Sequence, residues 1–218
     1  MAPTAEAAMF LTSRLRMVDL QLRGRGVGDE RVLDVMSRVP RHEFTGGRYR
    51  DQAYEDYPLP IGEGQTISQP YIVALMLEAL ALTPADRVLE VGTGSGYVTA
   101  LLAELAAQVA SVERYAALAN DAGNLLTHLG YGNVKIIVGD GSQGYPAGAP
   151  YDAIIVSAAA PEVPPALLAQ LAEGGRMIIP IGSFDTQQLQ LIHMRNGQPQ
   201  TQLRELCRFV PLVTENGS

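Results

Sequence analysis

The stretch RVLEVGTGSG, residues 87–96, decides how the rest of the chain is interpreted. Its first half is a compact apolar run that a turn signal closes, which predicts a short buried strand. A glycine-rich turn follows, and residues 97–107 predict a helix whose N-terminal amides and dipole point towards that turn. Doubly wound parallel sheets hold nucleotide-like ligands at a turn of this kind.

The spacing of the glycines indicates the class of ligand. The turn has the pattern G-x-G-x-G at Gly92, Gly94 and Gly96, whereas the dinucleotide fingerprint would need a glycine at position 97. A P-loop is excluded because no Gly-Lys-Ser/Thr follows. The next predicted strand, residues 109–113, ends in Glu113, about twenty residues after the first glycine, where an acidic side chain can bind both hydroxyls of a ribose. The sequence therefore predicts an adenosine-containing cofactor, most simply S-adenosylmethionine; the alternative is a ligand-free turn with a solvated glutamate.

Length and composition predict one globular domain over residues 1–218, with an N-terminal helical and loop cap (1–60) and a catalytic sheet core (61–218). The net charge of −7 disfavours a nucleic-acid partner, although the arginines near the N-terminus leave a local basic patch open. The single cysteine and three scattered histidines predict neither a disulfide framework nor a metal site. The absence of a long apolar run and of a signal-peptide layout predicts a cytoplasmic protein without a membrane span.

Strand and helix patterns alternate along the chain, which predicts a mostly parallel α/β sheet that ends in a hairpin. Further helices are expected over 5–23, 29–38, 69–82, 115–129 and 164–171, and further strands over 134–138, 152–156, 176–181, 189–194 and 203–213. Pro211 places the last strand at an edge of the sheet. The connection 41–69 has little periodicity, and a loop of that length is expected to carry part of the substrate site.

Several segments resemble the protein-L-isoaspartate O-methyltransferases in order over about residues 14–213: PIGEGQTISQPYIVALMLEAL (60–80), RVLEVGTGSGYVTALLA (87–103), VASVER (109–114), GDGSQG (139–144), PYDAIIVSAAAPEVPPAL (150–167) and RFVPLV (208–213). The segment QTISQP is the most specific, because methyltransferases in general share only the glycine turn. The resemblance implies a Rossmann-like, seven-stranded methyltransferase sheet with an antiparallel last strand. It also implies methyl transfer from S-adenosylmethionine to the free carboxylate of L-isoaspartyl residues in damaged proteins and peptides, which initiates repair through a succinimide and leaves S-adenosylhomocysteine.

The resemblance also implies roles for individual residues. The active-site serine falls on Ser68, and the substrate residues fall on Thr66, Ser68, Gln69, Phe209 and Val210. The cofactor residues fall on Glu90, Gly92, Gly94, Ser95, Gly96, Glu113, Asp140 and Gly141. The chain departs from the family pattern at Ser142 and Ala160. For Ser68 the alternative is that it only caps the helix that begins at positions 69–70.

The residue types suit this reaction, because a carboxylate is ionised near neutral pH and needs no general base. The alternatives are a carboxyl methyltransferase for one dedicated peptide, an RNA or small-molecule methyltransferase, and a silent cofactor-binding protein. The end of the chain soon after RFVPLV favours the general repair role over the dedicated one. We expect a monomer, and a dimer stays open.

Overall fold

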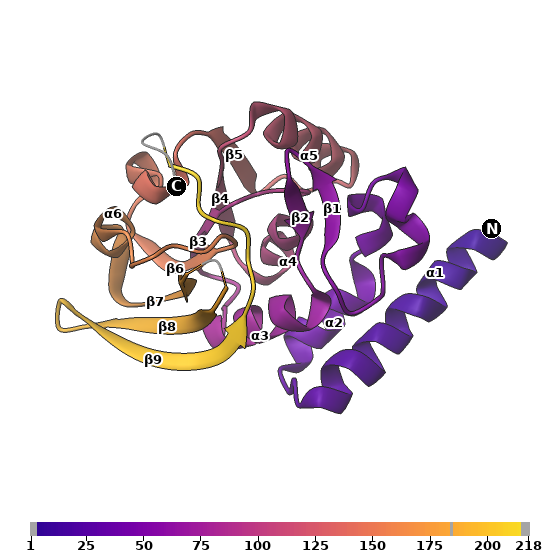
Figure 1. The fold of residues 1–218 in the computed structure, drawn as a ribbon, viewed down its shortest axis with the longest axis horizontal. Coiled ribbons are helices and arrows are strands. Elements are labelled where there is room, and N and C mark those ends of the chain that lie inside the picture. The colour runs from indigo at the N-terminus through magenta and orange to yellow at the C-terminus, as the bar shows by residue number, and fades with distance from the viewer. Residues whose placement is uncertain (1–3, 184, 215–218) are drawn as a thin grey trace.

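The computed structural model describes residues 4–183 and 185–214, and it is built around one seven-stranded sheet (Figure 1). The strands are β3 (Arg87–Val91), β4 (Gln108–Glu113), β5 (Val134–Val138), β6 (Tyr151–Val156), β7 (Leu171–Gly182), β8 (Gln187–Arg195) and β9 (Gln198–Cys207). They lie in the order β5-β4-β3-β6-β7-β8-β9. Strands β3 to β7 are parallel, whereas β8 is antiparallel to both β7 and β9. The last strand is therefore antiparallel to its neighbour, as expected.

Strand β3 lies at the point where the strand order reverses. The chain passes outward from β3 to β4 and β5 and then returns to β6 on the other side of β3. Ligands in open α/β sheets bind outside the carboxyl ends of the strands at such a point. The topology therefore places the glycine-rich turn after β3 where a ligand is expected.

Helices cover both faces of the sheet, and two buried clusters form the core. The helices that follow the N-terminal layer are α3 (Pro70–Leu80), α4 (Tyr97–Leu105), α5 (Ala116–His128) and α6 (Pro165–Ala169). Alternation along β3 sends Val88 into the larger cluster with α3 and α4, and Leu89 into the smaller cluster with α6. Both clusters are continuous with the central strands, so β3 is held from both sides.

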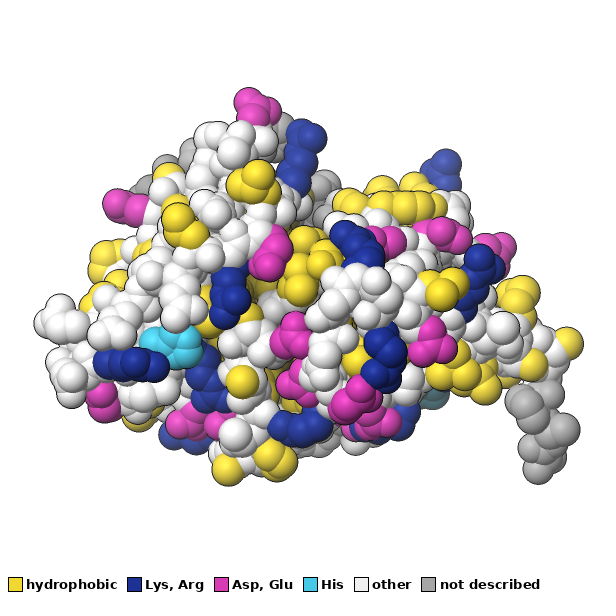
Figure 2. Space-filling view, turned by 90° about the horizontal axis from the view of Figure 1, so that it is seen from below, with side chains coloured by type: hydrophobic (Ala, Val, Ile, Leu, Met, Phe, Trp, Pro, Cys, Tyr) yellow, Lys and Arg dark blue, Asp and Glu magenta, His cyan; other side chains and the backbone are white. Residues whose placement is uncertain are grey.

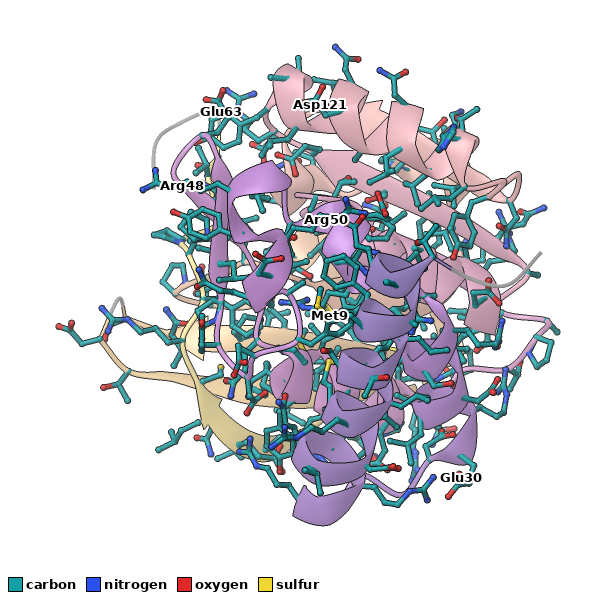
Figure 3. The ribbon with its side chains drawn as sticks, turned by 90° about the vertical axis from the view of Figure 1, so that its right-hand side faces the viewer. Met9, Glu30, Arg48, Arg50, Glu63 and Asp121 are labelled. Atoms are coloured by element: carbon teal, nitrogen blue, oxygen red, sulfur yellow. The ribbon has the colours of Figure 1, made fainter. Side chains whose placement is uncertain are left out.

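An N-terminal layer packs onto the larger cluster, at the right of Figure 1. It consists of α1 (Ala5–Arg16), a π-helix (Met17–Leu22), α2 (Glu30–Arg38) and three short 3₁₀ helices (Arg23–Arg25, Arg41–Phe44 and Gly47–Gln52). Arg50 lies beside α1 (Figure 3) and forms ion pairs with Glu6 and Glu43, at 3.2 and 2.7 Å. These contacts tie the 3₁₀ segment to the first helix.

The structure differs from the expected elements in two places near the site. The connection 41–69 is not an irregular loop: it contains β1 (Leu59–Gly62) and β2 (Gln65–Ile67), which form an antiparallel hairpin. The expected boundary between residues 60 and 61 falls inside β1, and the division into cap and core stays a prediction.

The expected strand over 203–213 is too long, because β9 ends at Cys207. β9 is an edge strand of the sheet, as expected for the last strand, but it does not contain Pro211, which forms an isolated bridge to Ala159. A proline has no N–H to extend a ladder, and after β9 the chain leaves the edge of the sheet and crosses the carboxyl ends of the strands. Hydrogen bonds from Ala159 N to Val210 O (2.8 Å) and from Leu212 N to Ala159 O (2.7 Å) hold this C-terminal segment, which is yellow in Figure 1.

The arginines near the N-terminus do not form a free basic patch. Arg23 pairs with Glu30, Arg25 pairs with Asp56, and Arg14 donates from Nε to the Ser37 carbonyl at 2.6 Å. Seen from below, basic and acidic side chains are interspersed over the surface (Figure 2). No helix among the described residues is long and apolar enough to cross a membrane.

Candidate active site

The turn after β3 depends on backbone conformations that favour glycine. Gly92 has a φ of 93° and Gly94 a φ of 53°, and L side chains rarely adopt such values. The Gly92 N–H donates to the Val112 carbonyl at 2.8 Å, so the turn continues the pairing between β3 and β4. A Cβ on Gly92 would lie 3.5 Å from the Cβ of Ser157, which lines the cavity described below. The glycines therefore leave the backbone of the turn open to that cavity.

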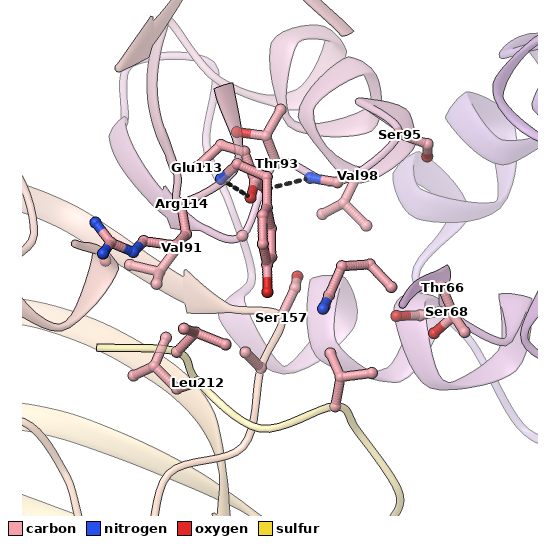
Figure 4. Close-up of a pocket in the computed structure, with 18 of the residues that line it drawn as sticks. Thr66, Ser68, Val91, Thr93, Ser95, Val98, Glu113, Arg114, Ser157 and Leu212 are labelled. Carbon is pink, nitrogen blue, oxygen red and sulfur yellow. Dashed lines mark hydrogen bonds between the residues drawn. The ribbon is translucent and has the colours of Figure 1, made fainter. Parts of the chain in front are cut away.

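Glu113, at the end of β4, fixes this turn. Its Oε2 accepts a hydrogen bond from Gly94 N at 2.8 Å, and its Oε1 accepts one from Tyr115 N at 2.9 Å (Figure 4). Each carboxylate oxygen has two acceptor sites, so the side chain can still accept from ligand hydroxyls. Glu113 lines the cavity although it is only 5% exposed. The sequence-predicted position for a ribose contact thus faces the cavity.

A cavity opens at the carboxyl ends of β3, β4 and β6, and we call it the cofactor cavity. It encloses about 710 Å³, counting the open solvent at its mouth. Glu113 and Arg114 lie on one side and Thr66 and Ser68 on the opposite side, with Ser157 between them (Figure 4). Its lining includes the following residues predicted from the sequence: Thr66, Ser68, Gly92, Gly94, Ser95, Glu113, Gly141 and Val210.

A second cavity adjoins the first, and we call it the acceptor cavity. All five residues that the resemblance assigned to the substrate line it: Thr66, Ser68, Gln69, Phe209 and Val210. The two cavities share four lining residues, which form the wall between them: Thr66, Ser68, Ser157 and Val210. A group bound in one cavity would therefore meet a group bound in the other across this shared wall.

Ser68 does not cap the helix that follows it, so that alternative is wrong. Helix α3 begins at Pro70 with Gln69 in the N-cap position, and the side chain of this N-cap residue makes no capping hydrogen bond. Asp56 supports the helix start instead, because its Oδ1 accepts from Tyr71 N at 3.2 Å and its Oδ2 from Gln69 Nε2 at 2.8 Å. The Ser68 hydroxyl is therefore left for a role at the shared wall.

Glu90 is placed behind the turn and does not line the cofactor cavity. It is fully buried, and its Oε2 accepts hydrogen bonds from the hydroxyls of Thr99 and Ser111, both at 2.6 Å. The Thr93 and Ser111 hydroxyls are 2.5 Å apart, so this network reaches into the glycine turn. Burial raises the pKa of the Glu90 carboxyl to about 8. Glu90 thus supports the turn from within the core.

Two other predicted cofactor residues also lie outside the cavity lining. Asp140 accepts from the N–H of Ser142 at 2.9 Å and caps the short 3₁₀ helix Gly141–Gln143. Gly96 faces α5, where a Cβ would lie 3.2 Å from the Cβ of Ala122. Neither Ser142 nor Ala160, the two departures from the family pattern, lines the cofactor cavity. The departures therefore do not alter its wall directly.

The sequence analysis missed several lining residues: Thr93, Tyr97, Val98, Arg114, Tyr115, Ser157 and Leu212. Ser157 follows β6 directly, and the rule that ligands bind beyond the carboxyl ends of strands at a reversal of strand order could have identified it. Leu212 carried no such signal, because the segment that contains it was expected to be a strand.

Comparison with known proteins gives one consistent family. The model of the family described as "Protein-L-isoaspartate(D-aspartate) O-methyltransferase (PCMT)" matches residues 14–217. A protein-L-isoaspartate O-methyltransferase of Koribacter versatilis is 55% identical over 217 residues, which cover 100% of this chain and 98% of that protein. The enzyme of that name from Methanoculleus marisnigri is 54% identical over 97% of this chain and 96% of its own.

Solved structures agree with the sequence comparisons. A structure named protein-L-isoaspartate O-methyltransferase superimposes with a TM-score of 0.85 at 32% identity, over 94% of this chain and 67% of that one. A putative enzyme of this kind from Plasmodium falciparum, solved in complex with S-adenosyl-L-homocysteine, gives a TM-score of 0.80 at 31% identity. That match covers 91% of this chain and 97% of the other.

Proposed function

The chain belongs to the protein-L-isoaspartate O-methyltransferase family, and on this premise we propose that Thr66 and Ser68 hold the acceptor carboxylate at the wall shared by its two cavities. The enzyme transfers a methyl group from S-adenosylmethionine to the free carboxylate of L-isoaspartyl residues in damaged proteins and peptides. The methyl ester initiates repair through a succinimide. The assignment of the residues rests on one observation: the same hydroxyl side chains line both cavities.

The residues of the cofactor cavity fit S-adenosylmethionine. Glu113 keeps free acceptor capacity beside the turn, which suits a pair of ribose hydroxyls. At Gly141 a Cβ would lie 2.5 Å from Val91 Cγ1, so the cavity wall tolerates no side chain there. When bound, S-adenosylmethionine supplies an electrophilic methyl group on a positively charged sulfur. The described residues contain no cluster of histidine, cysteine and acidic side chains that could hold a metal ion.

The chain's own contribution to the reaction is to bind and orient. An ordinary carboxyl has a pKa of about 4, so the acceptor reaches the site ionised and no protein group has to remove a proton. The hydroxyls of Thr66 and Ser68 donate to it and fix its direction towards the cofactor cavity. Phe209 and Val210, on the C-terminal segment, cover the peptide beside it and exclude water.

The replacement Ser68→Ala tests this proposal. We expect turnover of an L-isoaspartyl peptide to fall roughly 100-fold, as is usual when a positioning donor is lost, while the affinity for S-adenosylmethionine changes less than about twofold. Ser37→Ala is the matched control, because the Ser37 hydroxyl donates to the Asp34 carbonyl on α2 and Ser37 lines neither cavity. A peptide of the same sequence with a normal aspartyl residue measures background labelling. Equal losses of turnover and cofactor affinity in Ser68→Ala would contradict the proposed role.

We further propose that the enzyme acts as a cytoplasmic monomer that binds neither nucleic acid nor membranes. The net charge of −7 and the interspersed surface charges support this proposal. Light scattering at assay concentration measures the mass in solution, and a dimer mass would overturn the monomer. Retention by an anionic-lipid or nucleic-acid matrix at low salt would overturn the proposal that the enzyme binds neither membranes nor nucleic acid.

A further inference from the structure

Arg41 is a fully buried cation directly behind the shared wall. It begins the 3₁₀ helix Arg41–Phe44 and has no exposed surface. Its Nε donates to the Ala53 carbonyl at 2.7 Å, and its Nη2 donates to the Ser68 carbonyl at 2.8 Å. Its Nη1 has no hydrogen-bond partner within the described residues. The side chain thus ties the N-terminal layer to the residue that separates the two cavities.

The charge of Arg41 is only partly offset by the fold, because Asp56 acts on it electrostatically but forms its own ion pair with Arg25. None of the ion pairs among the described residues includes it, whereas the other largely buried arginine, Arg176, pairs with Asp86. Burial lowers the pKa of Arg41 to about 10, which still leaves the guanidinium protonated at neutral pH. A buried charge without a direct ion pair costs stability, so a further negative charge at the shared wall would be favourable for Arg41.

The surroundings of Arg41 point towards the cavities. Its guanidinium carbon lies 4.8 Å from the centre of the Tyr97 ring, and Tyr97 lines the cofactor cavity. The Tyr97 hydroxyl is buried and interacts with the Arg41 guanidinium. Ser68 lines both cavities, so Arg41 contacts one residue of the shared wall and one residue of the cofactor cavity.

We propose that Arg41 is a positioning residue for the acceptor carboxylate: it fixes the main chain of Ser68 and places a positive charge behind the shared wall. The bound carboxylate adds to the negative charge that Asp56 supplies only in part. Arg41 does not line either cavity, so it acts through Ser68 and through its field and does not touch the substrate. This inference rests on the proposed role of the Ser68 wall.

The variants Arg41→Gln and Arg41→Lys separate charge from position, with Arg176→Gln and Arg176→Lys as matched controls. Arg176 also donates to main-chain carbonyls, those of Leu80 and Asp152, but it lies at the other end of the strands. We expect Arg41→Gln to lower kcat/KM for the L-isoaspartyl peptide roughly tenfold or more with S-adenosylmethionine affinity nearly unchanged. The Arg176 variants are expected to lower Tm while leaving kcat/KM and the affinity for S-adenosylmethionine nearly unchanged.

A second measurement isolates the charge. The Kd of the L-isoaspartyl peptide is compared with that of the same peptide carrying a neutral carboxamide in place of the free carboxylate. Wild type and Arg41→Lys are expected to prefer the carboxylate, and Arg41→Gln is expected to lose roughly tenfold of that preference. Arg41→Lys keeps a charge but has no guanidinium fork to bond both carbonyls, so its kcat is expected to fall severalfold.

The outcomes distinguish this inference from the proposed function. A wild-type protein that methylates the peptide, with an Arg41→Gln variant that keeps the carboxylate preference, would overturn the charge role alone. If Arg41→Gln does not fold, Arg41→Lys decides: wild-type kcat and KM in that variant would overturn the positioning role. Failure of wild type to methylate the L-isoaspartyl peptide, or an unaffected Ser68→Ala variant, would instead count against the proposed function.

Discussion

The cofactor cavity and the acceptor cavity are built from different kinds of contact. On the cofactor side, main-chain pairing between β3 and β4 continues into the turn, and Glu113 bonds the Gly94 N–H at 2.8 Å. On the acceptor side, side chains from the N-terminal layer and from the turn before β1 hold the segment after β2: Arg41 reaches Ser68 across 27 positions of sequence, and Asp56 reaches Gln69 across 13. One wall depends on backbone conformation and the other on single polar side chains, so we expect mutations to separate cofactor binding from acceptor binding.

The largest expected effect follows from the backbone at Gly92. In Gly92→Ala the strain of a φ of 93° falls on the turn itself, and the added Cβ occupies space beside Ser157 at the cofactor cavity, so cofactor affinity is expected to fall about 100-fold or more. Gly130→Ala is the control, because Gly130 has a φ of 87° with nothing within 4 Å of an added Cβ. Both variants should lose about 1–2 kcal/mol of stability. Equal cofactor affinity of the two variants, measured by calorimetry, would show that cofactor binding does not depend on the backbone conformation at Gly92.

Glu113→Gln is expected to weaken cofactor binding about 10- to 100-fold, because it removes a charged acceptor and turns an amide N–H towards a main-chain N–H. The matched control is Glu173, whose carboxylate also accepts two main-chain hydrogen bonds, from Asn196 N and Gly197 N, on the surface. Glu173→Gln should leave cofactor affinity at the wild-type value. The Kd of S-adenosylhomocysteine measures both, and a Glu113→Gln variant with unchanged affinity contradicts the role of Glu113.

The same contrast explains which parts of the site were predictable. The glycine turn and Glu113 could be predicted because they follow apolar strands that pair with each other, and the strand pattern is local. The hairpin β1–β2 could not, since its strands are short and interrupted by Pro60 and Gly62, which leaves no alternation to detect. The capping role of Asp56 was also hidden, because the sequence offered Ser68, the nearer residue, for it.

Glu90, which was expected among the cofactor residues, does not line the cofactor cavity. The family pattern associates this position with the cofactor, yet alternation along β3 places it on the same face as Val88, towards α4. The strand period alone therefore indicates a core position. The strand predicted over 203–213 is too long for another reason. The course of the C-terminal segment across the sheet depends on hydrogen bonds to Ala159, which is distant in sequence.

Asp56→Asn tests the acceptor side with a smaller expected effect. The new amide would face the Gln69 amide N–H and the Arg25 guanidinium, so the start of α3 should loosen. We expect KM for the L-isoaspartyl peptide to rise about fivefold to tenfold with cofactor affinity unchanged. Asp34→Asn, which alters an exposed ion pair with Arg38 on α2, is the control. A larger loss of cofactor affinity than of peptide affinity would show that the two walls are not independent.

The smallest effect on activity is expected for Glu90→Gln, which instead changes how stability depends on pH. Burial raises the pKa of Glu90 from 4.5 to about 8 in the folded protein. Between these values the unfolded chain has released the proton that the folded protein keeps. The free energy of unfolding therefore falls as the pH rises through this window, by at most a few kcal/mol.

Glutamine keeps an oxygen acceptor for the Thr99 and Ser111 hydroxyls but does not titrate, so the variant should lose this downward slope. Urea unfolding at about pH 5 and about pH 8 measures it. Burial lowers the pKa values of His42 and His193, which gives stability an opposing upward trend as the pH rises towards 6.5, so only the difference between wild type and variant isolates Glu90. Glu173→Gln should keep the wild-type slope, because the pKa of Glu173 is lowered and its titration lies below this window. If the free energies of unfolding of wild type and Glu90→Gln change in parallel with pH, Glu90 is ionised in the folded protein. The glycine turn would then rest on a buried charge, as the Ser68 main chain does on Arg41.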